Sequence, residues 1–264
     1  MAITVRDLQA YKSRGERFAV LTAYDYTMAR ILAAADIPVL LVGDTLGMVV
    51  LGHPTTVPVE MHDMLHHARA VARGAPDQLL VGDLPFGSYH TSDDDAIGNA
   101  VAMLKAGMHA VKLEGGGRIA PLVARLVERG IPVMGHLGLT PQSVNVFGGY
   151  RVQGRDDEAA ARIAADARAL ADAGAFSMVL EGVPRAVAAQ VTAEVAVPTI
   201  GIGAGPECDG QVLVLHDMLG LTQGAVPKFV RSYADLGTAT SEAARTFARE
   251  VREGTFPDDK HSYH

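Results

Sequence analysis

The stretch Val39-Leu-Leu-Val-Gly-Asp-Thr-Leu-Gly47 joins an apolar run of branched residues to a glycine and an aspartate. Such a run is typical of a strand that is buried on both faces, as in a parallel sheet. Asp44 would then lie where a buried strand emerges, so its carboxylate is held rigidly and can still reach a ligand. The same pattern recurs in Leu79-Leu-Val-Gly-Asp-Leu-Pro85, with Asp83 in the place of Asp44.

Apolar runs of this kind alternate with helix-forming segments along the whole chain. The predicted strands cover residues 18–24, 39–42, 79–81, 110–114, 132–136, 177–181, 198–203 and, more weakly, 211–215. We expect an irregular or hairpin excursion over 48–59, and a missing or very short helix after the seventh strand. Eight strand and helix units in 264 residues predict an α/β fold with a parallel sheet closed into a (β/α)8 TIM barrel. A doubly wound open sheet is the alternative, since counting strands does not reveal closure.

Composition and termini indicate the class of protein. No composition break suggests a second domain, so we expect one barrel domain over residues 1–264, with a short N-terminal leader and a helical tail over 241–253. The single cysteine, Cys208, excludes an internal disulfide and fits a reducing compartment. No stretch approaches a membrane span, so we expect a cytoplasmic protein. A net charge of −7 and the absence of Trp argue against a nucleic-acid partner.

Polar and mostly ionisable side chains end five successive predicted strands. They are Asp44, Asp83, Glu114, His136 and Glu181. Lys112 lies two residues before Glu114 and therefore on the same side of its strand. The carboxyl ends of the strands of a barrel meet at one face, where active sites of this fold lie. The sequence therefore predicts a shared cavity that holds four carboxylates, one lysine and one histidine.

Carboxylates crowded in this way repel one another unless a proton, a lysine or a metal ion neutralises them. Oxygen ligands with few sulfur or histidine donors favour Mg²⁺ or a similar ion over zinc. The simpler alternative is that a single aspartate after a strand caps the next helix. His136 is equally open between a substrate contact and a structural hydrogen-bonding histidine.

Several longer motifs are similar to a known family. They are Leu21-Thr-Ala-Tyr-Asp25, Val42-Gly-Asp-Thr-Leu-Gly-Met48, Asp83-Leu-Pro-Phe86, Val111-Lys-Leu-Glu-Gly-Gly116, Gly135-His-Leu-Gly-Leu-Thr-Pro-Gln-Ser143, Phe147-Gly-Gly-Tyr150, Ile200-Gly-Ile-Gly-Ala-Gly205 and Pro227-Lys-Phe229. They run in order from about residue 20 to residue 230. On these motifs the chain closely resembles the ketopantoate hydroxymethyltransferases, which make ketopantoate in pantothenate synthesis.

The resemblance implies a barrel of the phosphoenolpyruvate/pyruvate type, a Mg²⁺ ion and 5,10-methylenetetrahydrofolate as the one-carbon donor to 3-methyl-2-oxobutanoate. The family pattern places metal ligands at Asp44 and Asp83, with Glu114 near the metal. It places the 2-oxo acid against Asp44, Thr45, Asp83 and Lys112, with His136 beside it, and the proton acceptor at Glu181. The family usually has Ser at the position of Thr45, so the hydroxyl is kept and a methyl group is added. The resemblance also implies a large homo-oligomer, decamers included.

Two other functions fit a barrel of this kind. One is a Mg²⁺-dependent lyase or mutase of the phosphoenolpyruvate/isocitrate lyase type, which shares the enolate chemistry. Those enzymes typically use a catalytic cysteine loop or phosphate-binding groups, and the sequence shows neither. The other is a catalytically silent barrel that serves as a binding protein. The presence of Asp44, Asp83, Lys112 and Glu181 together disfavours it.

Overall fold

The computed structural model describes residues 2–224 and 226–263, which form two compact units divided after Val214. The first unit is a closed barrel of eight parallel strands paired in sequence order, β1 with β2 and onward until β8 pairs with β1. Its strands are β1 Phe18–Thr22, β2 Val39–Val42, β3 Leu79–Asp83, β4 Ala110–Glu114, β5 Val133–Gly138, β6 Ser177–Glu181, β7 Thr199–Ile202 and β8 Gly210–Leu213. The predicted closed barrel is confirmed and the open sheet is excluded.

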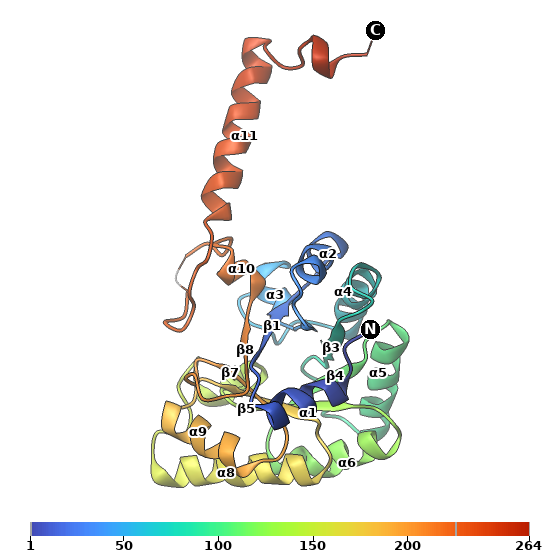
Figure 1. Cartoon of the computed structure of the whole chain (residues 1–264), viewed down its shortest axis with the longest axis vertical. Coiled ribbons are helices and arrows are strands. Elements are labelled where there is room, and N and C mark those ends of the chain that lie inside the picture. Colours follow the sequence, from blue (N-terminus) through green and yellow to red (C-terminus); the bar gives the residue numbers. More distant parts are fainter. Residues whose placement is uncertain (1, 225, 264) are drawn as a thin grey trace. The chain divides into compact units, whose positions relative to one another are not determined.

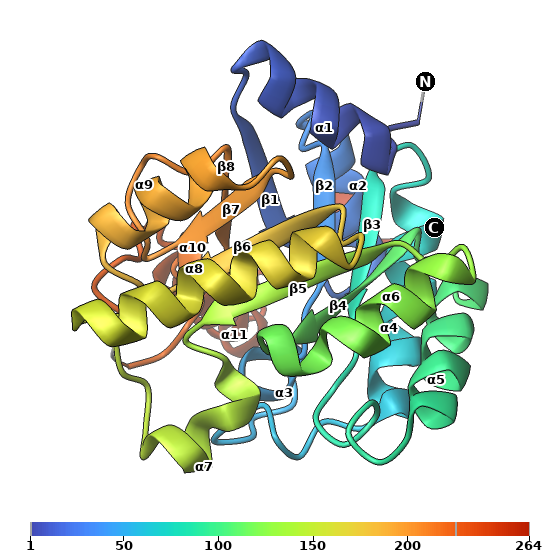
Figure 2. The ribbon, with the colours of Figure 1, turned by 90° about the horizontal axis from the view of Figure 1, so that it is seen from below.

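Helices surround the strands of this barrel, as Figures 1 and 2 show for α4, α5, α6, α8 and α9. The helical segments of the first unit are α1 Val5–Arg14, α2 Tyr26–Ala34, α3 Leu46–Val49, α4 Met61–Gly74, α5 Asp93–Lys105, η1 Gly117–Ile119, α6 Ala120–Glu128, η2 Pro141–Ser143, α7 Val144–Phe147, α8 Asp157–Asp172 and α9 Arg185–Glu194. Polar residues cap several of them; the Asp25 side chain accepts the Met28 N–H at 2.8 Å at the start of α2. No helix in the described part of the chain is long and apolar enough to cross a membrane.

Two connections can be compared with the sequence prediction, namely the one between β2 and α4 and the one between β7 and β8. Residues 50–59 are irregular, which is one of the two forms expected, and they form no hairpin. The short helix α3 begins at Leu46, soon after β2, and turns lead from it to α4. Between β7 and β8 the described chain has no helix, as predicted. The barrel therefore remains closed with an incomplete ring of covering helices.

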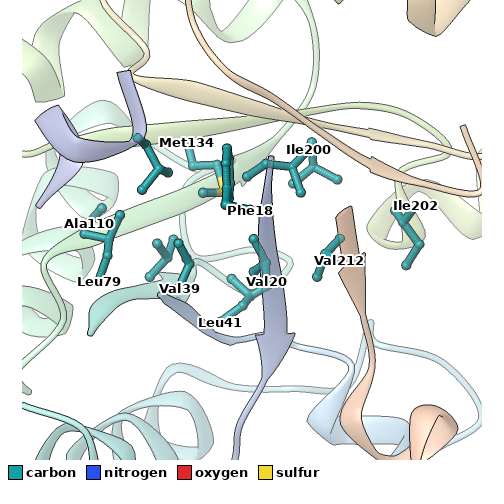
Figure 3. Close-up of a cluster of buried hydrophobic side chains, with 13 residues drawn as sticks. Phe18, Val20, Val39, Leu41, Leu79, Ala110, Met134, Ile200, Ile202 and Val212 are labelled. Carbon is teal, nitrogen blue, oxygen red and sulfur yellow. The ribbon is translucent and has the colours of Figure 1, made fainter. Parts of the chain in front are cut away.

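The barrel interior is filled by alternate residues of each strand, because successive side chains of a strand point to opposite faces. Figure 3 shows this cluster, in which Phe18 and Val20 of β1 lie among Val39, Met134 and Ile200. The prediction that 39–42 is buried on both faces is confirmed, since all four residues are buried.

The amino-terminal end of the barrel is closed by α1, which forms within the short N-terminal leader that the sequence predicts. Leu8 of α1 is fully buried in the barrel core. The Ile3 N–H donates to the Asp77 carbonyl at 2.8 Å, just before β3. Lys12 Nζ lies 2.9 Å from Asp209 Oδ2, just before β8. The core is thus sealed at this end, and an open pocket is left to the opposite end.

The second unit contains α10 Leu215–Met218, α11 Leu236–Glu253 and η3 Asp259–His261. The helix expected over 241–253 ends where predicted and starts earlier, at Leu236. Its start is fixed by Asp235, whose side chain accepts the Thr238 N–H at 3.2 Å. The prediction of one domain over the whole chain stays a prediction.

Packing between α2 and α4 predicts a sharp contrast between two glycines. A Cβ on Gly74 would lie 2.6 Å from the Tyr26 carbonyl oxygen and 2.8 Å from the Ala29 Cβ, so Gly74→Ala should lower the free energy of unfolding by about 1–3 kcal/mol. Gly98 is exposed within α5, and a Cβ there meets no atom within 4 Å. Gly98→Ala should raise the free energy of unfolding by about 0.5–1 kcal/mol. Urea unfolding of both variants checks this, and equal effects would contradict the packing described.

Candidate active site

A pocket of about 50 Å³ lies within the first unit and gathers every residue that the sequence predicts as functional. Its wall contains Asp44, Thr45, Asp83, Lys112, Glu114, His136 and Glu181. Apolar residues of the barrel core, such as Leu41, Val179 and Ile202, also line it. The structure therefore brings all seven predicted side chains together, although their individual roles stay predictions.

The alternation that builds the core also points these side chains inward. Lys112 lies two residues after the core residue Ala110 on β4, and Glu181 lies two residues after the core residue Val179 on β6. On both strands the inward face thus carries an apolar core residue and, two positions further toward the carboxyl end, an ionisable residue. The pocket lies at the carboxyl ends of the strands, where active sites of this fold are found.

Asp83 connects three of the strands that line the pocket. Its Oδ2 accepts the backbone N–H of Asp44 at 3.0 Å, and its Oδ1 lies 2.9 Å from Lys112 Nζ. All three side chains are almost completely buried. The ends of β2, β3 and β4 are therefore held in one arrangement by charge-assisted contacts.

His136 lies between two carboxylates at the end of β5. Its Nδ1 lies 3.3 Å from Glu114 Oε1 and 3.4 Å from Lys112 Nζ, and its Nε2 lies 3.2 Å from Glu181 Oε2. These are ion-pair distances, and His136 is 3% exposed. His136 thus links Glu114 of β4 to Glu181 of β6.

Sequence reasoning missed two buried residues that touch this group. Gln142 of η2 donates from Nε2 to Asp44 Oδ2 at 2.8 Å. The hydroxyl of Tyr89, in the connection between β3 and α5, donates to Gln142 Oε1 at 2.7 Å. Neither residue ends a strand, so the strand-end pattern does not find them; Gln142 lies inside one of the family motifs, which is the only signal in the sequence.

The carboxylates of the pocket repel one another. Burial and the charges of Asp83 and Glu114 raise the pKa of Asp44 well above its ordinary value. Burial also raises the pKa of Asp83, although contacts with Lys112 and with the Asp44 N–H oppose this shift. Burial alone would lower the pKa of Lys112, but the charges of Asp83, Glu114 and Asp44 outweigh it and raise that pKa. Asp44 is therefore the carboxylate whose charged form this pocket disfavours most.

His136 and Glu114 stabilise each other's charged forms. Burial and the Lys112 charge would lower the pKa of His136, but the contacts with Glu114 and Glu181 raise it to about 9. Burial would raise the pKa of Glu114, but His136, Lys112 and the Gln142 N–H lower it. His136 is thus a cation near neutral pH.

The donor set fits a divalent cation. The ionised pocket carries a formal excess of two negative charges, from four carboxylates against two basic side chains (Asp44, Asp83, Glu114 and Glu181 against Lys112 and His136). Among the residues that the structure describes, no group of three or more His, Cys, Asp or Glu side chains is arranged as a metal site. Mg²⁺ is commonly bound by one or two carboxylates together with substrate and water, so two aspartates at neighbouring strand ends suit it.

A closed parallel barrel with this pocket at the carboxyl ends of its strands defines the protein as a (β/α)8-barrel enzyme. Comparison with known families sharpens that class. The chain belongs to the ketopantoate hydroxymethyltransferase family, whose model matches residues 2–259. The 3-methyl-2-oxobutanoate hydroxymethyltransferase of Carboxydothermus hydrogenoformans is 56% identical over 262 residues, covering 99% of this chain and 95% of that protein. The resemblance carried by the sequence motifs is confirmed.

Solved structures confirm the type of barrel. Phosphonopyruvate hydrolase in complex with oxalate and Mg²⁺ aligns with a TM-score of 0.63 at 15% identity, covering 99% of this chain and 93% of that one. A 2,3-dimethylmalate lyase of the PEP mutase/isocitrate lyase superfamily aligns with a TM-score of 0.61 at 20% identity, covering 100% and 92%. At these identities the likeness shows the fold alone.

The raised pKa of His136 predicts how stability depends on pH. A folded-state pKa of about 9 against an ordinary value of 6.5 gives a stabilising contribution that is complete below pH 6.5 and is lost as pH rises through 9. The advantage of wild type over His136→Gln in unfolding free energy should shrink over this range by on the order of 3 kcal/mol. Urea unfolding in EDTA at several pH values measures it. A difference between wild type and His136→Gln that stays constant with pH would contradict the ion pairs.

Proposed function

We propose that the chain transfers a hydroxymethyl group from 5,10-methylenetetrahydrofolate to 3-methyl-2-oxobutanoate and so makes ketopantoate. The observation that carries the proposal is the single pocket in which Asp44, Asp83, Lys112 and Glu181 meet. Membership of the family and the relative at 56% identity support the same reaction. Loss of any one of these side chains would have favoured a silent barrel.

We propose Asp44 and Asp83 as the residues that would hold Mg²⁺, with Glu114 near it. When bound, the ion would polarise the 2-oxo acid and stabilise the enolate formed at C3. Glu114 is already engaged, since its Oε2 accepts the Gln142 N–H at 2.9 Å and its Oε1 faces His136. Glu114 therefore supports the site mainly by its charge. Lys112 would neutralise the carboxylate of the oxo acid, and the Thr45 hydroxyl would contact it from the start of α3.

Glu181 is the proposed base that removes the C3 proton. β2 and β6 are four strands apart in a ring of eight, so Asp44 and Glu181 come from opposite sides of the pocket. An oxo acid bound near Asp44 and Asp83 would therefore present its C3 toward Glu181. His136, 3.2 Å from Glu181, would orient this carboxylate and contact the substrate. The new carbon–carbon bond would form between C3 and the methylene carbon of the folate. Both bonds from that carbon to the folate nitrogens would break, one water would supply the hydroxyl oxygen, and tetrahydrofolate would leave.

The folate cosubstrate, the cytoplasmic location and the homo-oligomeric state belong to the same proposal. The relatives' name supports a one-carbon transfer, and 5,10-methylenetetrahydrofolate supplies a carbon at the required oxidation level. The decamer implied by the family resemblance stays a prediction.

Proton exchange at C3 of 3-methyl-2-oxobutanoate tests the proposal as a whole. In D₂O the protein with Mg²⁺ should exchange the C3 proton, and addition of 5,10-methylenetetrahydrofolate should give ketopantoate. The measurement is NMR of the substrate, with EDTA as the matched control. Absence of exchange under every condition would contradict the enzyme function, and exchange without transfer would point to the lyase or mutase alternative.

Replacement of the proposed base should separate binding from chemistry. Glu181→Gln keeps the size and a hydrogen-bonding group beside His136, so binding of the oxo acid should stay near the wild-type level. Deuterium wash-in at C3 should fall by at least about 100-fold, because a general base typically contributes that much. Glu158→Gln, at an exposed position of α8, is the control and should exchange normally. Normal wash-in by the Glu181 variant would show that another group removes the proton.

A further inference from the structure

The side-chain amide of Gln142 is buried and makes hydrogen bonds through both Nε2 and Oε1. It is 4% exposed and lies in η2, directly after the loop that follows β5. Its Nε2 donates to Asp44 Oδ2 at 2.8 Å and to the Leu84 carbonyl at 3.0 Å. Its Oε1 accepts the Tyr89 hydroxyl at 2.7 Å, and its backbone N–H donates to Glu114 Oε2 at 2.9 Å. One residue therefore connects groups that follow or end β2, β3 and β4.

These partners fix which way the amide points. Two acceptors, a carboxylate and a carbonyl, lie on the Nε2 side, and a hydroxyl donor lies on the Oε1 side. A reversed amide would place Oε1 against both acceptors in a buried site, which leaves them without a donor. The donor toward Asp44 is thus built into the network.

Tyr89 holds the far end of the amide. It is 5% exposed, and its hydroxyl also accepts the Glu114 N–H at 3.2 Å. A hydroxyl has one hydrogen to give, and the 2.7 Å contact with Gln142 Oε1 is shorter than the 3.3 Å contact with the Glu114 carbonyl. The hydroxyl of Tyr89 therefore gives its hydrogen to Gln142. Tyr89 orients Gln142 in this way and does not itself donate to Asp44.

We propose that Gln142 is a positioning residue for Asp44: its amide holds one carboxylate oxygen, so that the side chain keeps a single orientation in which the other oxygen serves a ligand. The inference rests on the proposed metal-binding role of Asp44. A carboxylate ligand that is itself hydrogen-bonded keeps its direction, and loss of such a partner typically costs 10–100-fold in metal affinity. Tyr89 would act on Asp44 through Gln142 in the same way, with a smaller effect.

The test measures binding of Mn²⁺ alone to the full chain, because Mn²⁺ takes the same oxygen ligands as Mg²⁺ and its EPR signal separates free from bound ion. Gln142→Met keeps the length of the side chain and removes its donor, so the dissociation constant should rise about 10–100-fold. Tyr89→Phe keeps the amide and should raise it about threefold, as expected for one lost neutral hydrogen bond. Gln211→Met, at an exposed glutamine of β8, is the control and should bind as wild type.

Urea unfolding midpoints separate positioning from a purely structural role. A structural amide would shift the midpoint of Gln142→Met and leave Mn²⁺ affinity at the wild-type value, and that result would overturn the proposal. If Gln142→Met does not fold, Tyr89→Phe decides the question, and wild-type affinity in that variant is the contrary outcome.

The variant Asp44→Asn distinguishes a failure of the proposed metal site from a failure of the proposed role of Gln142. Wild-type Mn²⁺ affinity in Asp44→Asn would show that Asp44 is not a metal ligand, so the proposed site itself would be wrong. Loss of binding in Asp44→Asn, with wild-type affinity in Gln142→Met, would leave the proposed function standing and reject the inference about Gln142 alone.

Discussion

Closure of the barrel imposes one constraint on every strand, namely that alternate side chains share a single interior. On β3 the inward column runs from Leu79 and Val81 to Asp83, and on β6 it runs from Val179 to Glu181. The apolar half of each column excludes water, and the same walls fix the ionisable half around the pocket. A shift of one residue in register would turn both halves outward. Core and active site are therefore two ends of one alternating pattern of side chains.

This arrangement has an electrostatic cost. Burial, and then the charges of Asp83 and Glu114, disfavour the charged form of Asp44 and raise its pKa. The pocket limits the cost by contact with Lys112 and His136 and by the hydrogen bond from Gln142. The formal charge that remains uncompensated in the ionised pocket is negative, and such a charge favours a cation over an anion. The free energy of folding of the barrel must therefore offset the cost of burying these carboxylates.

The sequence was sufficient for those residues whose place depends on strand position alone. Asp44, Asp83 and Glu181 could be assigned to one face because each follows or ends a buried run, and parallel strands end together. Gln142 and Tyr89 could not be assigned in this way, because they lie in connections whose path is set by contacts with distant segments. The short helix α3 was not predicted for a different reason, because four residues give too little helical periodicity to distinguish it from a turn.

The order of strands around the ring also explains how a shared fold supports different reactions. Barrels that are only 15–20% identical to this chain keep the same architecture, so architecture alone cannot select the chemistry. The ring brings β2 and β3 together on one side and sets β6 across from β2. Under the proposed roles, an oxo acid held at Asp44 and Asp83 would have its remaining carbons toward β5 and β6. Glu181, the side chain that ends β6, would then be placed to remove a proton there, as proposed. Under the proposed roles, the residue that ends the strand across the ring would therefore select the chemistry.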